Sequence, residues 1–224
     1  MRIAMLMGVY HEHSRIGACI RRHKRYVDGV FITHDGPCSD GTIEIAERLG
    51  AMCTATQERK YYGDPSYEIS RLAALEAGYD WGMMVAPDEQ FSYALLESLR
   101  KFISDADFDK GYHRVALQVS IRTRYLPLGT EKFDDRVDCQ TRVFELDKAY
   151  FSGIIHTGMS LNGRVMQIDP EYYIDHWPNA VDNTGKKERY LEVAKLQLAQ
   201  HGRTDKEIAH LRSVIKHTKD AASG

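Results

Sequence analysis

Short apolar runs alternate with helical patterns in the N-terminal half, and this alternation restricts the fold more than any other feature. The first run, Ile3–Val9, is apolar throughout, as in a strand that is buried on both faces. Similar runs follow at 29–33, 51–55 and 81–86, each separated from the next by an amphipathic stretch. Strands that alternate with helices form βαβ units, whose right-handed crossovers build a mostly parallel sheet with helices on both faces. We therefore predict an α/β fold.

The second half has a different pattern. Longer strand-like segments with mixed faces occur at 115–125 and 141–146, and a further extended region covers 165–176. Two charged, periodic helices are expected at 185–200 and 204–217. No internal repeat or low-complexity linker divides the sequence, and 224 residues fit one domain.

Composition argues against several classes of protein. Lys and Arg number 30 and Asp and Glu 32, a balance that gives no bulk reason to expect nucleic-acid or membrane binding. The longest apolar run, 3–9, is far shorter than the roughly 20 residues of a membrane span. The start has no signal-peptide pattern, so we expect a cytoplasmic protein without integral membrane association. The cysteines have no CxxC spacing, so we expect reduced thiols and no zinc knuckle; they are Cys19, Cys38, Cys53 and Cys139.

Polar and aromatic residues follow three of the predicted strands. In open α/β sheets, ligands bind beyond the carboxyl ends of the strands, so these residues form a candidate binding rim. The sequence has neither GxGxxG after the first strand nor a GKS or GKT loop, which argues against a classical dinucleotide fold and a phosphate-cradling loop. The rim residues are Tyr10, His11 and Glu12, then His34 and Asp35, then Asp88 and Glu89.

Motifs occur in a fixed order along the chain. They are FITHDGPCSDGT at 31–42 with IA and GA after it, SRLAAL at 70–75, DWGMMVAPDE at 80–89, RVF at 142–144 with GIIH at 153–156, and KERY at 187–190. In this order they resemble the motifs of family 2 glycosyltransferases with a GT-A fold. The segment at 80–89 corresponds to the part of that family that holds the D-x-D metal motif.

The resemblance implies a mixed, mostly parallel sheet flanked by helices, with a helical C-terminal tail, in a single domain over 1–224. Residues 1–104 would form the nucleotide-sugar-binding half, 105–180 the acceptor-side half and 181–224 the C-terminal helices. The implied activity is transfer of a sugar from a nucleotide-diphosphate donor, which we expect to be a UDP-sugar, with Mn²⁺ or Mg²⁺. Inversion at the anomeric carbon is commoner than retention in such enzymes. The acceptor stays open between a glycan, a protein, a small metabolite and a modified nucleic-acid base.

Donor-binding roles follow from the same resemblance. Tyr10 would stack on the base, and Asp35 would accept a hydrogen bond from a base N–H. Arg71 would bind the base or diphosphate through its two-pronged guanidinium. Asp88 would ligate the metal on the diphosphate. Glu89 would contact the donor or only the backbone of the site.

Metal and acceptor roles fall on residues further along the chain. His176 would join Asp88 as a metal ligand, and its nitrogen suits Mn²⁺ better than Mg²⁺. His156 and Asp138 are the candidate catalytic residues on the acceptor side, and Asp135 is a further candidate base.

Departures from the family pattern keep alternatives open. Ala86 occupies the first acidic position of D-x-D, Leu72 replaces an Asn after Arg71, and Thr157 replaces a Glu after His156. The change at Ala86 motivates the alternative of a degenerate GT-A module that binds a nucleotide or glycan without turnover. A nucleotidyltransferase is a third possibility. The sequence lacks a Gly-rich loop with Arg and Lys after the first strand, which argues against it.

Overall fold

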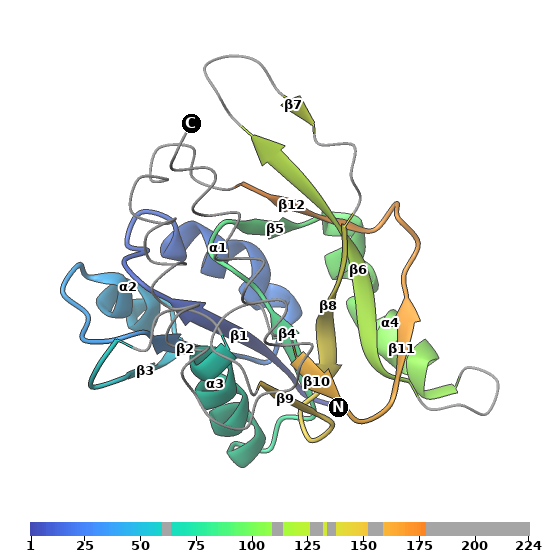
Figure 1. The fold of residues 1–224 in the computed structure, drawn as a ribbon, viewed down its shortest axis with the longest axis horizontal. Coiled ribbons are helices and arrows are strands. Elements are labelled where there is room, and N and C mark those ends of the chain that lie inside the picture. The colour runs from blue at the N-terminus through green and yellow to red at the C-terminus, as the bar shows by residue number, and fades with distance from the viewer. Residues whose placement is uncertain (60–63, 109–113, 126–131, 134–137, 152–158, 178–224) are drawn as a thin grey trace, which may run out of the picture.

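The computed structural model shows an α/β fold (Figure 1). The structure describes residues 1–59, 64–108, 114–125, 132–133, 138–151 and 159–177. Its main sheet has ten strands, eight of which follow the order β3-β2-β1-β4-β8-β6-β12-β5, while β7 and β11 pair with β6. A second sheet contains two strands, β9 and β10.

The N-terminal part of the sheet is parallel. Strand β1 (Ile3–Val9) lies between β2 (Gly29–His34) and β4 (Trp81–Met84), and β3 (Met52–Ala55) pairs with β2 at the edge. The connecting helices are α1 (Ile16–His23), which continues as a 3-10 turn at Lys24–Tyr26, then α2 (Thr42–Arg48) and α3 (Asp64–Glu76). The strands and crossovers thus form the βαβ units that the sequence predicts.

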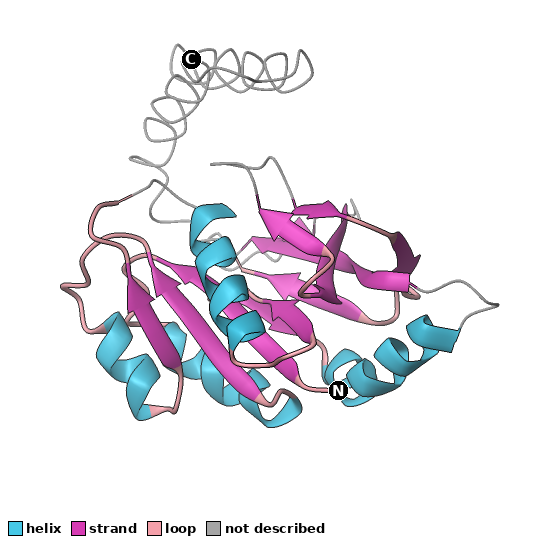
Figure 2. Ribbon diagram, turned by 90° about the horizontal axis from the view of Figure 1, so that it is seen from below, coloured by secondary structure: helices cyan, strands magenta, loops and turns pink. Residues whose placement is uncertain are grey.

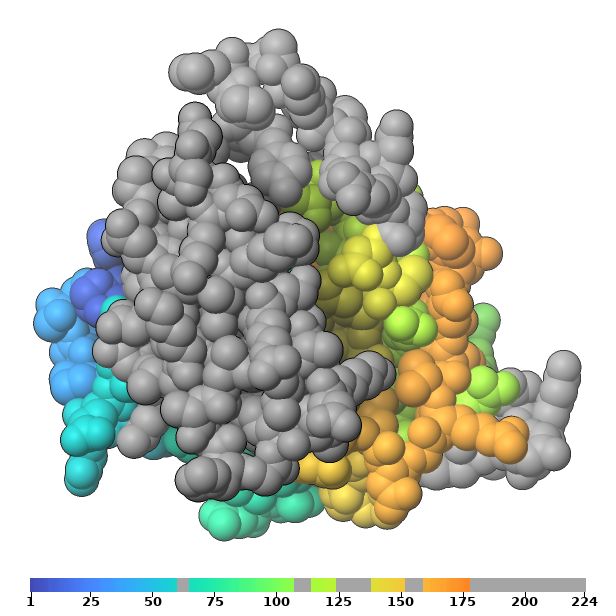
Figure 3. All heavy atoms as spheres, viewed as in Figure 1, coloured from blue at the N-terminus to red at the C-terminus, as the bar shows by residue number. Residues whose placement is uncertain are grey.

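The second half adds the antiparallel pairings. Strand β8 (Asp138–Glu145) runs antiparallel to both β4 and β6 (Arg114–Tyr125), and β12 (Tyr173–His176) is parallel to β6 and antiparallel to β5 (Glu89–Phe91). In Figure 3 the N-terminal elements, blue to cyan, lie on the opposite side of the molecule from the orange segment that includes β11. The remaining elements are α4 (Tyr93–Phe108), β7 (Lys132–Phe133), β9 (Ala149–Phe151), β10 (Met159–Leu161) and β11 (Arg164–Gln167).

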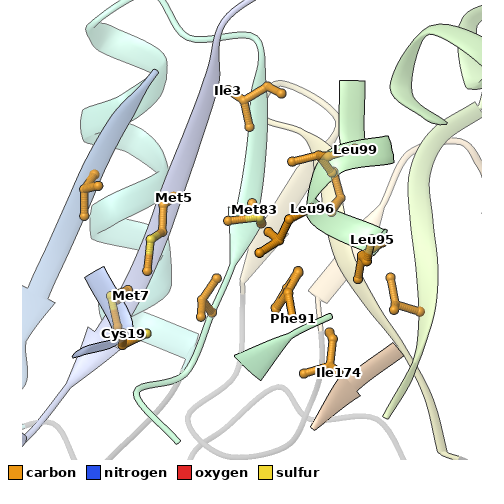
Figure 4. Packing of buried hydrophobic residues seen from close by; sticks show 14 of the residues in the cluster. Ile3, Met5, Met7, Cys19, Met83, Phe91, Leu95, Leu96, Leu99 and Ile174 are labelled. Atoms are coloured by element: carbon orange, nitrogen blue, oxygen red, sulfur yellow. The ribbon is translucent and has the colours of Figure 1, made fainter. Parts of the chain in front are cut away.

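Two hydrophobic clusters hold the layers together, one on each face of the sheet. Alternate side chains of β1 point to opposite faces, so Ile3, Met5 and Met7 pack with α1 and α4, while Ala4 and Leu6 pack on the α3 side. Figure 4 shows the larger cluster, in which the side chains of Phe91 and Ile174 from β5 and β12 join those of Leu95, Leu96 and Leu99 from α4. Figure 2 shows helices on both faces of the strands. Burial on both sides explains why the first strand is continuously apolar.

Close packing of α3 on β1 depends on a glycine. A Cβ added at Gly8 would lie 3.0 Å from Ser66 Cβ and 3.5 Å from the Tyr67 ring. The absence of a side chain there allows the first turn of α3 to lie directly over the carboxyl end of β1, where the candidate rim begins.

The predicted fold class, a mixed and mostly parallel sheet flanked by helices, is confirmed. The extended region predicted at 165–176 is two short strands, β11 and β12, separated by a turn. The sequence did not indicate β5, β9 or β10. The helices expected at 181–224 lie outside the described residues. Within the part of the chain that the structure describes, no helix is long and apolar enough to cross a membrane.

Candidate functional site

The rim lies at a switch point of the sheet. The chain leaves β1 through α1 to reach β2 on one side, and it returns through α3 to β4 on the other side of β1. The loops after β1 and β4 leave the carboxyl ends of two adjacent parallel strands, and the space beyond such strand ends is the usual ligand position in open α/β sheets. His11 follows β1 with a positive φ of 54°, a strained conformation for a residue other than glycine.

The end of the rim at β1 and β2 is aromatic. The rings of Tyr10 and His11 stack at 4.1 Å with an interplanar angle of 7°, and the Arg59 guanidinium lies 3.6 Å from the centre of the Tyr10 ring. A parallel ring and a guanidinium at these distances cannot share one face, so they cover opposite faces of Tyr10. A nucleotide base can therefore stack on Tyr10 only if Arg59 or His11 moves aside.

Asp35 lies directly beneath this aromatic end. It is the first residue after β2, it is 3% exposed, and its backbone N–H donates to Val9 O at 2.8 Å. That bond joins the ends of β1 and β2, so Asp35 and Tyr10 belong to the same corner of the sheet, as the sequence predicts. The base-binding roles of both residues stay predictions.

The end of the rim at β4 is charged. Asp88 Oδ2 lies 3.3 Å from His176 Nε2, and their side chains are 24% and 31% exposed. The backbone N–H of Trp177 donates to Asp88 O at 2.8 Å, which holds the end of β12 against the loop after β4. The two residues that the sequence nominates as metal ligands, Asp88 and His176, are thus side by side although they are remote from each other in the chain.

Electrostatics place Glu12 near Asp88. Burial raises the pKa of Glu12, and the charges of Asp88 and Asp40 act in the same direction, whereas the ion pair with Arg15 at 2.9 Å opposes them. Burial also acts to raise the pKa of Asp88, but His176 and Arg15 outweigh it, so the pKa of Asp88 is lowered. Asp88 is therefore ionised at neutral pH, in reach of a cation. Arg15 was not among the residues nominated from the sequence.

Glu89 is buried beneath the rim and serves the scaffold. Its carboxylate accepts from Arg142 Nη2 at 2.6 Å and from Arg142 Nε at 3.3 Å, and it also accepts the Ala86 N–H at 3.0 Å. Burial acts to lower the pKa of Arg142, but the charge and hydrogen bonds of Glu89 raise it overall. Of the two contacts expected for Glu89, donor or backbone, the structure shows the backbone one.

Arg71 is hydrogen-bonded within the fold, and its donor-binding role stays a prediction. The residue is 6% exposed. Its guanidinium donates to both Glu68 oxygens, at 2.8 and 2.6 Å, and to Leu146 O at 2.5 Å. Glu68 in turn accepts the Phe151 N–H at 3.1 Å. These bonds tie α3 to the segment after β8, so the two-pronged geometry predicted for the donor serves an internal ion pair. Glu68 and Arg71 are three residues apart in α3, so helical spacing alone makes them neighbours, whereas the bonds to Leu146 and Phe151 depend on the tertiary structure.

The acceptor-side candidates are only partly covered. Asp138 is exposed and begins β8. Because β8 runs antiparallel to β4, this end of β8 extends past the carboxyl end of β4, on the side of the rim. Asp135 and His156 lie outside the described residues.

A pocket of about 310 Å³ opens beside Asp88, between α1 and β5. Arg15, which directly precedes α1, and Arg22 of α1 line the pocket, and Trp177 and Tyr93 contribute aromatic rings. The carboxylates Asp88 and Glu89 line it as well, so the lining carries both signs of charge.

Comparisons with known proteins bear on this fold. The sequence matches no protein-family model and no curated protein. Among solved structures, Staphylococcus aureus TarS 1-349 in complex with UDP-GlcNAc is similar at a TM-score of 0.57, with 11% identity, over 97% of this chain and 71% of that chain. The same TarS segment in complex with UDP gives a TM-score of 0.55 with 12% identity, covering 97% and 70% of the two chains. TarS itself gives 0.53 with 10% identity, covering 97% and 43%. At such identities the likeness is one of fold, and this chain has the GT-A, nucleotide-diphospho-sugar transferase fold that its motifs predict.

Proposed function

We propose that this protein is a glycosyltransferase that uses a nucleotide-diphosphate sugar, most simply a UDP-sugar. The observation that carries the proposal is the meeting of Asp88 and His176, Oδ2 to Nε2 at 3.3 Å, at the carboxyl end of β4. The likeness of fold to TarS, which has been crystallised with UDP and with UDP-GlcNAc, supports a donor of this class.

The rim divides the donor between its two ends. We place the base at the aromatic end, on Tyr10 and against Asp35, and the diphosphate at the charged end near Asp88. Arg15, which is paired with Glu12 and lowers the pKa of Asp88, is a cation near that end. A base must deprotonate the acceptor hydroxyl, and Asp138 and His156 remain our candidates for it. The acceptor class stays open.

A divalent ion fits the charged end. Asp88 supplies an ionised oxygen and His176 a nitrogen, both still partly exposed, and such a mixed pair favours Mn²⁺ over Mg²⁺. When bound, the ion would offset the negative charge that develops on the leaving diphosphate. With Ala86 in the first D-x-D position, the protein offers few ligands, so the ion should bind weakly without the donor.

The test is release of UDP from UDP-sugars, with and without Mn²⁺, followed for the wild type, Asp88→Asn and the control Asp105→Asn. Asp105 is an exposed carboxylate on α4, so its substitution removes the same charge away from the rim. We expect metal-dependent turnover in the wild type and the control and at least a hundredfold loss in Asp88→Asn. Equal rates in all three proteins, or full activity in EDTA, would contradict the proposed site.

A binding module without turnover is the second candidate, and Ala86 favours it. In this structure Ala86 contributes only backbone groups, since its N–H donates to Glu89 and its carbonyl accepts the Cys19 thiol at 3.8 Å. UDP binding by calorimetry without turnover on any UDP-sugar would select this alternative. Absence of UDP binding would exclude UDP as the ligand under either candidate.

A further inference from the structure

The loop after β2 brings together a histidine, a thiol and a carboxylate. His34 ends β2, and Cys38 and Asp40 lie in the turn that leads to α2. One ligand atom from each residue lies within 4.8 Å of the others. The cluster is separate from Asp88 and His176, which belong to the ends of β4 and β12.

His34 is oriented as a ligand. The ring is fully buried, and its Nδ1 lies 2.7 Å from Gly36 O. A carbonyl can only accept, so Nδ1 carries the proton and Nε2 keeps its lone pair. The contact of Nε2 is long: the His11 backbone N–H points to it, with 3.5 Å between the two nitrogens. A histidine whose second nitrogen donates to a backbone carbonyl is the arrangement that fixes metal-binding imidazoles.

Cys38 and Asp40 have the spacing of ligands on one ion. Cys38 Sγ lies 3.4 Å from Asp40 Oδ1. In a tetrahedral zinc site, bonds of about 2.3 Å to sulfur and 2.0 Å to oxygen separate these two atoms by about 3.5 Å. The ligand atoms lie within 4.8 Å of one another, so they would have to approach by at most about 1.5 Å to reach the roughly 3.3 Å that separates nitrogen and oxygen ligands on one zinc ion.

Asp40 has a structural role that is compatible with a ligand role. Its oxygens accept the Thr42 N–H at 3.1 Å and the Thr42 hydroxyl at 2.8 Å, which caps α2. Burial acts to raise the pKa of Asp40, but these bonds, with those from Cys38 and His13, lower it to about 2. When the Cys38 thiol releases its proton to solvent, the Asp40 lone pair that accepted it becomes available to an ion.

We propose that His34 Nε2, Cys38 Sγ and an Asp40 oxygen bind a zinc-class divalent ion, at a second metal site beside the base-binding corner. One nitrogen, one sulfur and one oxygen form a borderline-soft set that suits Zn²⁺ and its spectroscopic substitute Co²⁺. His13 is our candidate for a fourth ligand, since its Nδ1 lies 3.6 Å from Asp40 Oδ2 and its side chain is 61% exposed. His13 or water completes the coordination.

Cobalt titration of the full chain, without nucleotide and after removal of metals with EDTA, tests this site. We expect one Co²⁺ to bind with a thiolate-to-cobalt charge-transfer band in the near ultraviolet. The band should vanish in Cys38→Ser and persist in Cys53→Ser, a half-buried cysteine on β3. It should also persist in Asp88→Asn, which separates this site from the one that serves the proposed transferase.

A second measurement guards against misfolding. Asp40→Asn keeps an oxygen for the α2 cap, so its circular dichroism should match that of the wild type, while Zn²⁺ affinity in a chelator competition should fall at least about tenfold, since even indirect partners of a metal cost that much. No charge-transfer band in the wild type, or the same band in Cys38→Ser, overturns the proposal. Unchanged Zn²⁺ affinity in a folded Asp40→Asn removes Asp40 from the site.

Discussion

The two ends of the rim differ in how their side chains are packed and paired. At the aromatic end, stacked groups cover one another, with His11 and Arg59 on either side of the Tyr10 ring. At the charged end, Glu89 and Arg142 form an ion pair whose side chains are 5% and 12% exposed, beneath an Asp88 that is 24% exposed.

The neighbouring carboxylates Asp88 and Glu89 differ in burial and in pairing. A buried, fully paired carboxylate cannot change partner without leaving a bare charge in the core, so it holds the loop in place. A partly exposed carboxylate such as Asp88, with one long contact to His176, can exchange that contact for a ligand. Burial and pairing, rather than residue type, therefore decide which carboxylate supports the site and which one can bind a ligand.

The largest effect should come from breaking the buried pair. Arg142→Met leaves Glu89 without its cation, and the free energy of unfolding should fall by about 3–5 kcal/mol in urea titrations. The control is Arg100→Met, which removes an ion pair to Asp28 with side chains 48% and 35% exposed and should cost no more than about 1 kcal/mol. The double variant Glu89→Gln/Arg142→Met should regain part of the loss. Equal costs for the two arginines would erase the distinction between the buried and exposed pairs.

A pH effect should follow from His23, which is buried under β5. Burial lowers its pKa from 6.5 to about 4, and the neutral ring contacts Cys19 O through Nδ1 at 2.8 Å and accepts the Phe91 N–H at 3.3 Å. The unfolded chain takes up this proton first, so stability is full above pH 6.5 and is lost as the pH falls toward 4. The loss should reach about 3 kcal/mol. His23→Gln should show a flatter pH dependence of urea unfolding; an identical slope would assign the effect to other groups.

At the aromatic end, the effect should appear in binding rather than stability. Asp35→Ala removes a charge-assisted hydrogen bond to the base and should weaken UDP binding by about 1–3 kcal/mol in calorimetry. Asp105→Asn provides the comparison with an exposed carboxylate on α4. Unchanged UDP affinity in Asp35→Ala would remove Asp35 from base recognition and leave that corner to the second metal site.

The smallest stability effect should come from Asp88. Asp88→Asn loses one partly exposed contact to His176, so the free energy of unfolding should change by less than about 1 kcal/mol. The same change should abolish the coupling between Mn²⁺ and UDP, measured as UDP affinity with and without the ion. Tight Mn²⁺ binding at this end in the absence of nucleotide would contradict the weak, donor-dependent site proposed for Asp88 and His176.

The sequence determined the parallel half of the fold because burial on both faces leaves a direct trace. Ile3–Val9 must be apolar at every position, and the same constraint marks β2 and β4. Strand ends then place Tyr10, Asp35 and Asp88 at one edge, since parallel strands share their carboxyl side. The short strands β5, β9 and β10, of three residues each, carry too few positions to show a period.

Partners across the chain were decided by tertiary structure alone. The sequence shows that Arg71, Glu89 and Arg142 are charged, but not that Arg71 donates to Leu146 O or that Glu89 bonds Arg142. Likewise, His34, Cys38 and Asp40 have no familiar metal-binding spacing, and only the turn after β2 brings their ligand atoms within 4.8 Å. Periodicity records which residues are buried, because burial acts on each position separately. A hydrogen bond depends on where two side chains meet in space, and that is fixed only when the sheet is assembled.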